Sequence, residues 1–143
     1  MKPLVVITGA SSGFGAEIAK LFAADNYPLL LLGRRQAKLA ALAANFENAM
    51  IDTVDVTNYH QFETAIRKAE AKYGKTDLLV NNAGLMLLGN VQNQDPQEWQ
   101  TMLNTNVMGV LNGTQIVLND MRDREHGTIL NMSSLDGTKT FVN

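Results

Sequence analysis

Residues 4–15 read Leu-Val-Val-Ile-Thr-Gly-Ala-Ser-Ser-Gly-Phe-Gly, and this stretch decides the fold. Its first five residues form an apolar run rich in β-branched side chains, which predicts a strand buried on both faces. After the glycines, apolar residues recur at helical spacing from Ala16 to Ala23. A buried strand, a glycine-rich turn and an amphipathic helix in direct succession are typical of the first unit of an α/β domain.

The same alternation continues along the chain. Further strands are expected at Leu29–Leu32, at Ala49–Ile51 with Val54–Val56, at Asp77–Asn81 and at Thr128–Met132. Helices are expected after Arg35, from Asn58 to Tyr73, and from Gln97 to Met121 with a bend. Parallel strands need such crossover helices, so we predict an α/β fold: a doubly wound parallel sheet of Rossmann type, truncated after its fifth strand. In such sheets ligands bind beyond the carboxyl ends of the strands.

Composition excludes several classes of protein. A length of 143 residues fits one domain, and 45% hydrophobic residues exclude wholesale disorder. With 12 basic and 14 acidic side chains there is no broad positive field, which argues against nucleic acid and anionic membranes as partners. The absence of cysteine and the presence of only two histidines exclude disulfides, thiolate sites and a three-histidine zinc site. We therefore expect no metal site.

No apolar run reaches the ~20 residues that a membrane helix needs. The first residues lead directly into a strand-like segment without a cleavage site, so a signal peptide is not expected. These features predict a cytoplasmic protein.

The glycine-rich turn has the chemistry of an anion site. Gly9, Gly13 and Gly15 follow the spacing GxxxGxG, and glycine permits positive φ and a close approach of backbone to phosphate. The helix that begins there directs free N–H groups and the positive end of its dipole at an anion. The candidate ligand-binding residues of this turn are Gly9, Ser11, Ser12, Gly13, Phe14 and Gly15. The alternative is a tight strand-to-helix turn whose glycines serve packing alone.

Four segments in register resemble the short-chain dehydrogenase/reductase family. Residues 8–15 resemble the cofactor loop of that family, and Asn81–Gly84 resembles its second motif. Asn106 resembles its helix asparagine, and residues 129–134 resemble its fifth strand and catalytic serine. The resemblance covers the entire chain. It implies an NAD(P)-dependent oxidoreductase that moves a hydride between a nicotinamide cofactor and a small carbonyl or alcohol substrate.

The end of the second strand indicates which cofactor is preferred. An acidic residue there accepts from the ribose hydroxyls of NAD, whereas an arginine accommodates the 2′-phosphate of NADP. The sequence has no acid at this point and continues Gly33-Arg34-Arg35. Guanidinium groups suit phosphate, so we predict a preference for NADP, with NAD as the alternative. Both arginines could instead be solvated charges at the start of a helix, a reading with more weight for Arg35 than for Arg34.

The resemblance assigns further cofactor contacts. Asp55 would accept from the adenine amine, and Val56 would pack on the ring. The alternative for this pair is an acid at the start of a helix followed by a core valine. The contacts implied by the second motif are Asn82, Ala83 and Gly84, whereas Asn81 is expected mainly to tie neighbouring strands together.

The resemblance also implies two catalytic residues. Ser134 would hydrogen-bond the substrate oxygen, with Ser133 as the weaker candidate because adjacent strand residues face opposite sides. Asn106 would hold a water that connects the catalytic lysine to solvent. Its alternative role is that of an interior helix residue bonded to backbone. Trp99 and Met102, in the helix expected between Gln97 and Met121, are interpreted as core residues.

The proton-transfer pair of the family is missing. That pair is a tyrosine followed four residues later by a lysine, and none of Tyr27, Tyr59 and Tyr73 has that partner. We therefore expect the chain to be the amino-terminal portion of a longer enzyme, inactive alone and a homo-oligomer at full length. The rival hypotheses are a non-catalytic NADP-binding module or redox-sensing regulator of the same fold, and a structural protein that has lost its cofactor.

Overall fold

The structure is a computed structural model that describes residues 2–134. Its elements are β1 (Leu4–Thr8), α1 (Gly13–Ala24), β2 (Leu29–Gly33), α2 (Gln36–Ala43), β3 (Ala49–Thr53), α3 (Tyr59–Tyr73), β4 (Thr76–Asn81), α4 (Pro96–Leu103), the π-helical turn η1 (Asn104–Met108), α5 (Gly109–Asp123) and β5 (Thr128–Asn131). All strand pairs are parallel, in the order β3-β2-β1-β4-β5. The predicted doubly wound sheet is therefore confirmed. The direction of winding reverses between β1 and β4, which is the switch point where such sheets bind ligands.

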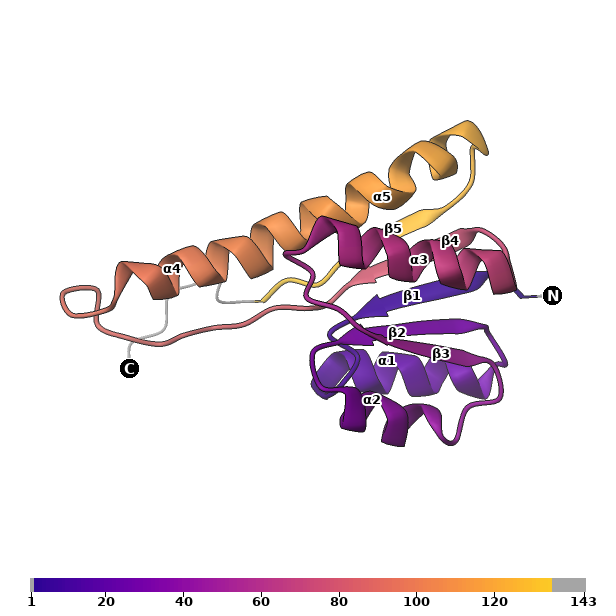
Figure 1. Ribbon diagram of the computed structural model, residues 1–143, viewed down its shortest axis with the longest axis horizontal. Helices are drawn as coiled ribbons and strands as arrows, with labels where there is room; N and C mark the ends of the chain where they lie inside the picture. Colours follow the sequence, from indigo (N-terminus) through magenta and orange to yellow (C-terminus); the bar gives the residue numbers. More distant parts are fainter. Residues whose placement is uncertain (1, 135–143) are drawn as a thin grey trace.

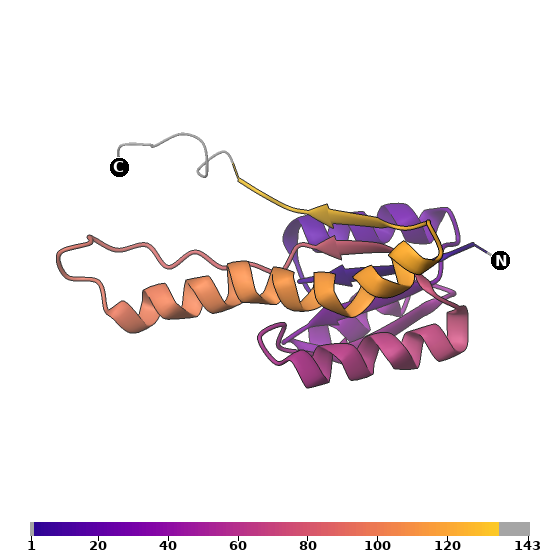
Figure 2. The same cartoon turned by 90° about the horizontal axis from the view of Figure 1, so that it is seen from above.

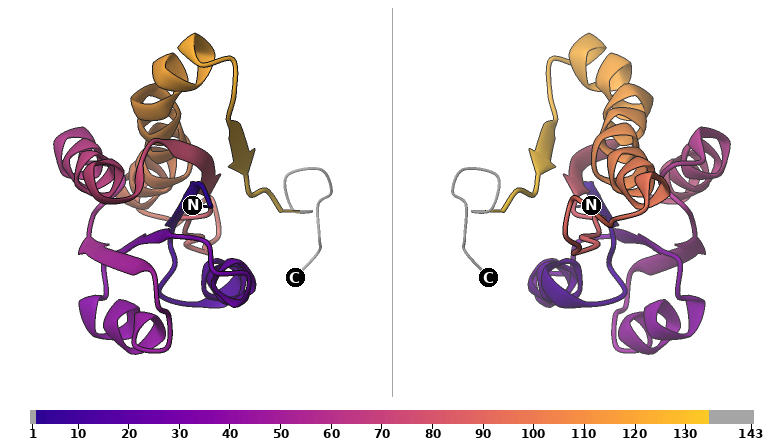
Figure 3. Two further views of the ribbon diagram at one scale, coloured as in Figure 1. Left: turned by 90° about the vertical axis from the view of Figure 1, so that its right-hand side faces the viewer. Right: turned by 90° about the vertical axis from the view of Figure 1, so that its left-hand side faces the viewer.

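Helices cover both faces of the sheet, α1 and α2 on one side and α3 and α5 on the other (Figures 1 and 3). Alternate residues of β1 explain the two layers. Val5 and Ile7 pack with Ala19 of α1, whereas Val6 packs with Phe62 of α3. Because every residue of β1 is buried, the strand needs apolar side chains on both faces, and its sequence supplies them.

The helix expected from Gln97 to Met121 is present but has three parts. Asp95 caps α4 by accepting from the N–H of Gln97 at 2.9 Å, and η1 replaces the expected bend. Figure 2 shows α4 and the segment before it projecting past the carboxyl ends of the strands. None of the eight residues of α4, all within the described chain, is buried, and Trp99 is 37% exposed. The expectation of a core residue is therefore wrong for Trp99, because α4 extends beyond the sheet that would cover it.

Three strands end at residues other than those predicted, and the second strand extends by one residue, to Gly33. The third strand ends at Thr53, and the apolar residues after it belong to a turn in which the N–H of Asn58 donates to the carbonyl of Asp55 at 2.9 Å. Val54 and Val56 are buried through side-chain packing. Because buried strands are apolar too, the apolar character of these two residues led to the prediction of a strand. The fifth strand ends at Asn131, although the N–H of Met132 still donates to the carbonyl of Asn81 at 3.0 Å.

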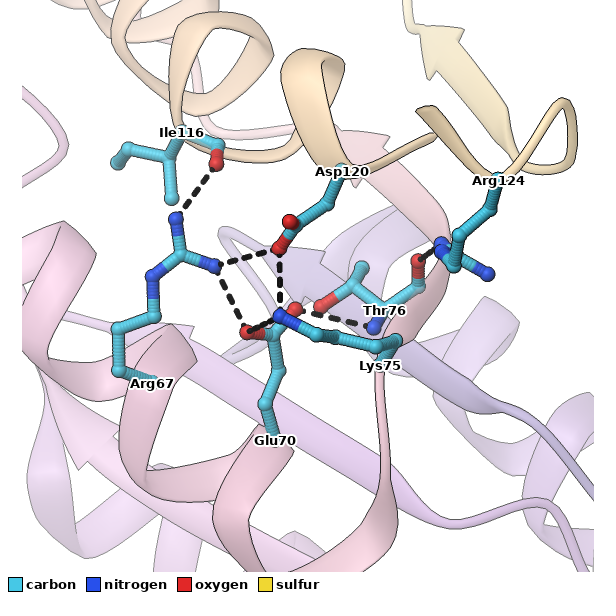
Figure 4. A network of polar contacts seen from close by, with 7 residues as sticks. All are labelled: Arg67, Glu70, Lys75, Thr76, Ile116, Asp120 and Arg124. Atoms are coloured by element: carbon cyan, nitrogen blue, oxygen red, sulfur yellow. Dashed lines mark hydrogen bonds and ion pairs between the residues drawn. The ribbon is translucent and has the colours of Figure 1, made fainter. Parts of the chain in front are cut away.

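A polar network at the amino-terminal end of β4 fixes α5 to α3 (Figure 4). Glu70, whose side chain is 7% exposed, accepts from Arg67 at 2.7 Å and from the N–H of Thr76 at 3.1 Å. Asp120 of α5 accepts from Lys75 at 2.7 Å and from Arg67 at 3.2 Å. The hydrogen bond from Lys75 lowers the pKa of Asp120, and the hydrogen bond to Glu70 raises the pKa of Arg67. The network therefore holds α5, which continues the helical unit from η1, where the candidate residue Asn106 lies.

No helix within residues 2–134 combines the length and the apolar character needed to cross a membrane.

Candidate functional site

The carboxyl ends of the central strands border a cleft of about 640 Å³. It lies at the switch point in strand order, between the loops that follow β1, β2, β3 and β4. Its lining residues are Gly9, Ser11, Ser12, Gly33, Arg34, Arg35, Val54, Asp55, Val56, Asn82, Ala83, Gly84 and Thr105. The structure thus brings together the candidate cofactor residues from all four loops. Gly13, Phe14 and Gly15 are not among those that line the cleft, and Phe14 is 75% exposed.

Two glycines of the loop are required by contacts with the protein's own chain. Gly9 has φ +64°, and a β-carbon there would lie 2.8 Å from the Cα of Ala83. A β-carbon at Gly15 would lie 2.5 Å from Nδ2 of Asn82. Packing, the alternative reading of this loop, is therefore a real requirement at these two positions. It does not compete with binding, because the same packing brings the ends of β1 and β4 together beside the cleft.

Thr8 and Asn82 connect the glycine loop to the end of β4. Oγ1 of Thr8 accepts from the N–H groups of Asn82 at 3.0 Å and of Ala83 at 2.9 Å. In return, Nδ2 of Asn82 donates to the carbonyls of Thr8 at 3.0 Å and Gly9 at 3.3 Å. The Asn82 amide nitrogen is thus used within the protein, which leaves the side-chain oxygen as the polar atom for a ligand.

Two arginines at the start of α2 face the serines of the loop. Arg35 donates through Nη2 to Oγ of Ser11 at 2.9 Å and to Oγ of Ser12 at 2.6 Å. Ser12 directly precedes α1 in extended conformation, and its side chain does not cap the helix. The Ser12 hydroxyl instead accepts the hydrogen bond from Arg35. Arg34 lines the same cleft and has no hydrogen bond or ion pair with the described residues. Two guanidinium groups and the positive end of the α1 dipole therefore meet at one place.

The segment after β3 forms another wall of the cleft. Asp55 lines it, and its Oδ1 accepts from the N–H and Oγ1 of Thr57 at 2.9 and 2.8 Å. Val56 also lines the cleft, but it is 7% exposed and belongs to the core cluster beneath α3 and α5. Val56 thus has the core role of the alternative reading, whereas Asp55 holds a turn ahead of α3, whose cap is Asn58. Both residues still border the cleft. Their contacts with adenine stay a prediction.

The two candidate catalytic residues lie outside the lining of this cleft. Oδ1 of Asn106 accepts from the N–H of Leu85 at 2.9 Å, and its Nδ2 donates to the carbonyl of Leu85 at 2.8 Å. The alternative role, a helix residue bonded to backbone, therefore describes the Asn106 side chain. Ser134 is exposed just beyond the end of β5, and its catalytic role stays a prediction.

Sequence reasoning missed four residues at the site. Thr8 was quoted within the loop without a role, although a hydroxyl at a buried strand end needs a hydrogen-bond partner. Gly33, Val54 and Thr105 also border the cleft. The positions of Gly33 and Val54, directly at strand ends, were a usable signal. Thr105 carried no such signal, because its placement depends on how α4 and η1 cross the sheet.

The expected role of Asn81 is visible in the structure. Its Nδ2 donates to Oδ1 of Asn131 at 2.9 Å, which ties β4 to β5. Within residues 2–134, no group of three or more histidine, aspartate or glutamate side chains is placed to hold a metal ion.

Comparison with known proteins identifies the family. A family model described as short chain dehydrogenase matches residues 3–143. The chain belongs to the short-chain dehydrogenase family. The resemblance found in the four motifs is thus confirmed, and it covers the whole sheet described above.

Individual members of the short-chain dehydrogenase family match almost the whole chain. An uncharacterized oxidoreductase of Staphylococcus saprophyticus is 36% identical over 139 residues, which cover 94% of this chain and 59% of that protein. The NADP-dependent 3-hydroxy acid dehydrogenase of Escherichia coli K12 is 35% identical over 141 residues, or 97% of this chain and 57% of that protein. The chain therefore spans less than two thirds of the length of these relatives.

Solved short-chain dehydrogenases have the same fold. The closed form of serine dehydrogenase complexed with NADP⁺ superimposes with a TM-score of 0.91 at 34% identity, covering 96% of this chain and 56% of that one. An actinorhodin polyketide ketoreductase with NADPH gives a TM-score of 0.93 at 28% identity, covering 99% of this chain and 56% of that one.

Proposed function

We propose that this chain forms the NADP-binding part of an oxidoreductase that transfers a hydride between the nicotinamide ring and a small carbonyl or alcohol substrate. One observation carries the proposal: the amino terminus of α1, Ser11, Ser12, Arg34 and Arg35 meet in a single cleft at the switch point. Such an arrangement suits a dinucleotide with an additional phosphate. Relatives named as NADP-dependent and structures holding NADP⁺ or NADPH support the same assignment.

The residues of the cleft fit the parts of NADP. The loop that leads into α1, from Gly9 to Ser12, would present N–H groups for the pyrophosphate. Arg34 and Arg35 supply fixed positive charge for the 2′-phosphate, and no carboxylate of the second strand end opposes it. Asp55, Val56 and the segment Asn82–Gly84 line the cleft. The first two would border the adenine, and the segment would border the other end of the cofactor. When bound, the cofactor supplies or accepts the hydride.

The roles proposed near the substrate belong to Ser134 and Asn106. Ser134 would donate a hydrogen bond to the substrate oxygen, which stabilises developing negative charge. Asn106 would fix the chain at Leu85, because both polar atoms of its side chain bind that residue. No tyrosine of the sequence has a lysine four residues later. We therefore assign the proton transfer to no residue of this chain and expect the 143-residue chain by itself to be inactive.

Titration of the full-length protein with NADPH and NADH tests the proposal. We expect tighter binding of NADPH, by tenfold or more, because a charge-assisted contact to phosphate is lost with NADH. Arg34→Asp should reverse the preference, since the carboxylate would repel the 2′-phosphate and accept from the ribose hydroxyls. Arg122→Asp, at the far end of α5, is the matched control for the charge change. Equal affinities for both cofactors before and after Arg34→Asp would refute the arginine assignment.

The regulator hypothesis is distinguished by turnover. An oxidoreductase should oxidise NADPH in the presence of at least one member of a carbonyl panel, and Ser134→Ala should reduce that rate without weakening NADPH binding. Tight binding of NADPH with no turnover would favour the non-catalytic sensor. Self-association of the full-length protein is part of the same proposal, and its measurement is sedimentation equilibrium.

A further inference from the structure

The segment after β3 touches α5 as well as the cleft. The carbonyl of Val56 accepts a hydrogen bond from Nδ2 of Asn112 at 2.9 Å, in a partly buried position. One turn earlier on the same helix, a β-carbon at Gly109 would lie 2.5 Å from Cγ2 of Val56. The helix backbone therefore lies directly against this valine. The hydrogen bond and the packing come from the same face of α5.

The other hydrogen bonds of the segment after β3 either join residues close together in the sequence or lie at the ends of the segment. Val54 is fixed through its N–H to the carbonyl of Gly33 at 3.1 Å. Asp55 bonds to Thr57 and Asn58, and its N–H donates to Oε1 of Gln61, six residues along the chain in α3, at 3.4 Å. Among the described residues, the hydrogen bond that reaches the middle of the segment from a distant part of the chain is the one from Asn112. This long-range bond, together with the packing of Gly109 against Val56, joins the middle of the segment to α5.

We infer that Asn112 is a positioning residue that sets the adenine end of the cofactor cleft through the carbonyl of Val56. The inference rests on the proposed function, because it needs adenosine to bind at this wall. The helix that contains Asn112 continues from η1, where Asn106 holds Leu85 near the other end of the cleft. One continuous helical unit thus positions both ends: Asn112 acts on the wall beside Asp55, and Asn106 acts on the segment after Gly84. The polar network of Arg67 and Asp120 fixes the same helix at its far end.

The test uses the full-length protein and the cofactor fragment 2′,5′-ADP. Asn112→Asp keeps the side-chain volume and removes the donor, and Asn112→Ala removes the donor without adding charge. Both should raise the Kd of 2′,5′-ADP about fivefold, the effect of one lost hydrogen bond. Binding of nicotinamide mononucleotide should be unchanged, since that fragment does not reach the wall. Asn119→Asp and Asn119→Ala are the matched controls, because Asn119 is exposed on the same helix.

Two further readouts separate positioning from stability. Amide hydrogen exchange of residues 54–58 should become faster in the Asn112 variants and stay unchanged in the Asn119 variants. Asn112→Gln, which keeps an amide donor, should lose less affinity than Asn112→Asp. A lowered unfolding midpoint with unchanged affinity for 2′,5′-ADP would overturn the inference and leave the proposed function intact. If the unaltered protein binds neither NADPH nor 2′,5′-ADP, the proposed function is wrong and the inference falls with it.

Discussion

A single added β-carbon shows how closely the glycine loop is fitted to the end of β4. Gly9→Ala places that carbon 2.8 Å from the Cα of Ala83 and also forces a residue with a side chain to φ +64°. Gly13 has φ +56° as well, but a β-carbon there meets no atom within 4 Å. We expect Gly13→Ala to cost about 1 kcal/mol from backbone strain alone. Gly9→Ala should cost about 3 kcal/mol and weaken NADPH binding, because backbone must move.

Urea unfolding and NADPH titration of the two variants provide the comparison. Both substitutions place alanine at a positive φ, but only the one at Gly9 brings the new β-carbon against other atoms. Gly13→Ala is therefore the matched control for backbone strain. Equal losses of stability in both would show that the contact with Ala83 is unimportant.

The hydroxyl of Thr8 is a second test at the scale of one side chain. Thr8→Val keeps the shape and removes the acceptor for the N–H of Ala83, which would stay partly buried without a partner, whereas the N–H of Asn82 still donates to the carbonyl of Val80 at 3.1 Å. One unpaired group of this kind costs about 1–3 kcal/mol, so a loss of roughly 2 kcal/mol is expected. Thr8→Ser keeps the acceptor and should lose much less. Chemical denaturation measures both, and a Thr8→Val protein as stable as the Thr8→Ser protein would contradict the prediction.

At the scale of elements, local sequence decided most of the architecture. The first strand, the turn and α1 were predicted because the local conformation that each residue type favours is the one it has in the fold. This holds from the apolar run at 4–8 to the glycines of the turn. The cap of α3 was predicted for the same reason, and Oδ1 of Asn58 accepts from the N–H of Gln61 at 3.1 Å. The end of β3 was not, because Val54 and Val56 are apolar for packing beneath α3 and α5, and a strand gives the same pattern.

Side chains that act across elements could not be predicted from the sequence. Nothing near Asn106 in the sequence indicates that its amide would hold Leu85, because the two residues meet only when η1 crosses the segment after β4. The same is true of Arg35: its position suggested a phosphate contact, with a solvated charge as the alternative, and its bonds to Ser11 and Ser12 depend on the pairing of β1 with β2. The residue types of the site were therefore predictable, and their partners were not.

The network that joins α3, β4 and α5 predicts a small dependence of stability on pH. The hydrogen bond from Lys75 lowers the pKa of Asp120 in the folded state. The stabilisation is therefore present above the unfolded-state pKa and is lost as pH falls through the lower folded-state pKa. Asp120→Asn should remove this contribution and flatten the stability profile in that acidic range. Because the Asp120 side chain is 36% exposed, solvent screening limits the effect to below about 1 kcal/mol.

Urea unfolding at a series of pH values between neutral and acid measures this contribution. Asp123→Asn is the matched control, since Asp123 lies on the same turn of α5 and pairs with the neighbouring Arg122 outside the network. Identical pH profiles for the Asp120→Asn and unaltered proteins would show that the network contributes no pH-dependent stability.

On the scale of the whole molecule, the two ends of the sheet have different tasks. At the amino ends of the strands, Glu70 and Arg67 connect elements through hydrogen bonds within the protein. At the carboxyl ends, Arg34 has no bond or ion pair with the described residues, and the serines of the loop face a cleft of about 640 Å³. At one end of the sheet the charged side chains of Arg67 and Glu70 are thus paired within the protein, and the other end presents charge and donors to a ligand.

This division predicts where cofactor binding stabilises the protein. At 100 times its Kd, NADPH should add about 2.7 kcal/mol to the free energy of unfolding, because it binds the folded state alone. NADH at the same concentration should add less, since it lacks the phosphate that meets Arg34 and Arg35. Hydrogen exchange should slow first in the loops after β1, β2 and β4, and the turn around Lys75 should gain only the global effect. Protection concentrated around Lys75 instead would place the ligand at the wrong end of the sheet, and the cleft would then have no part in binding.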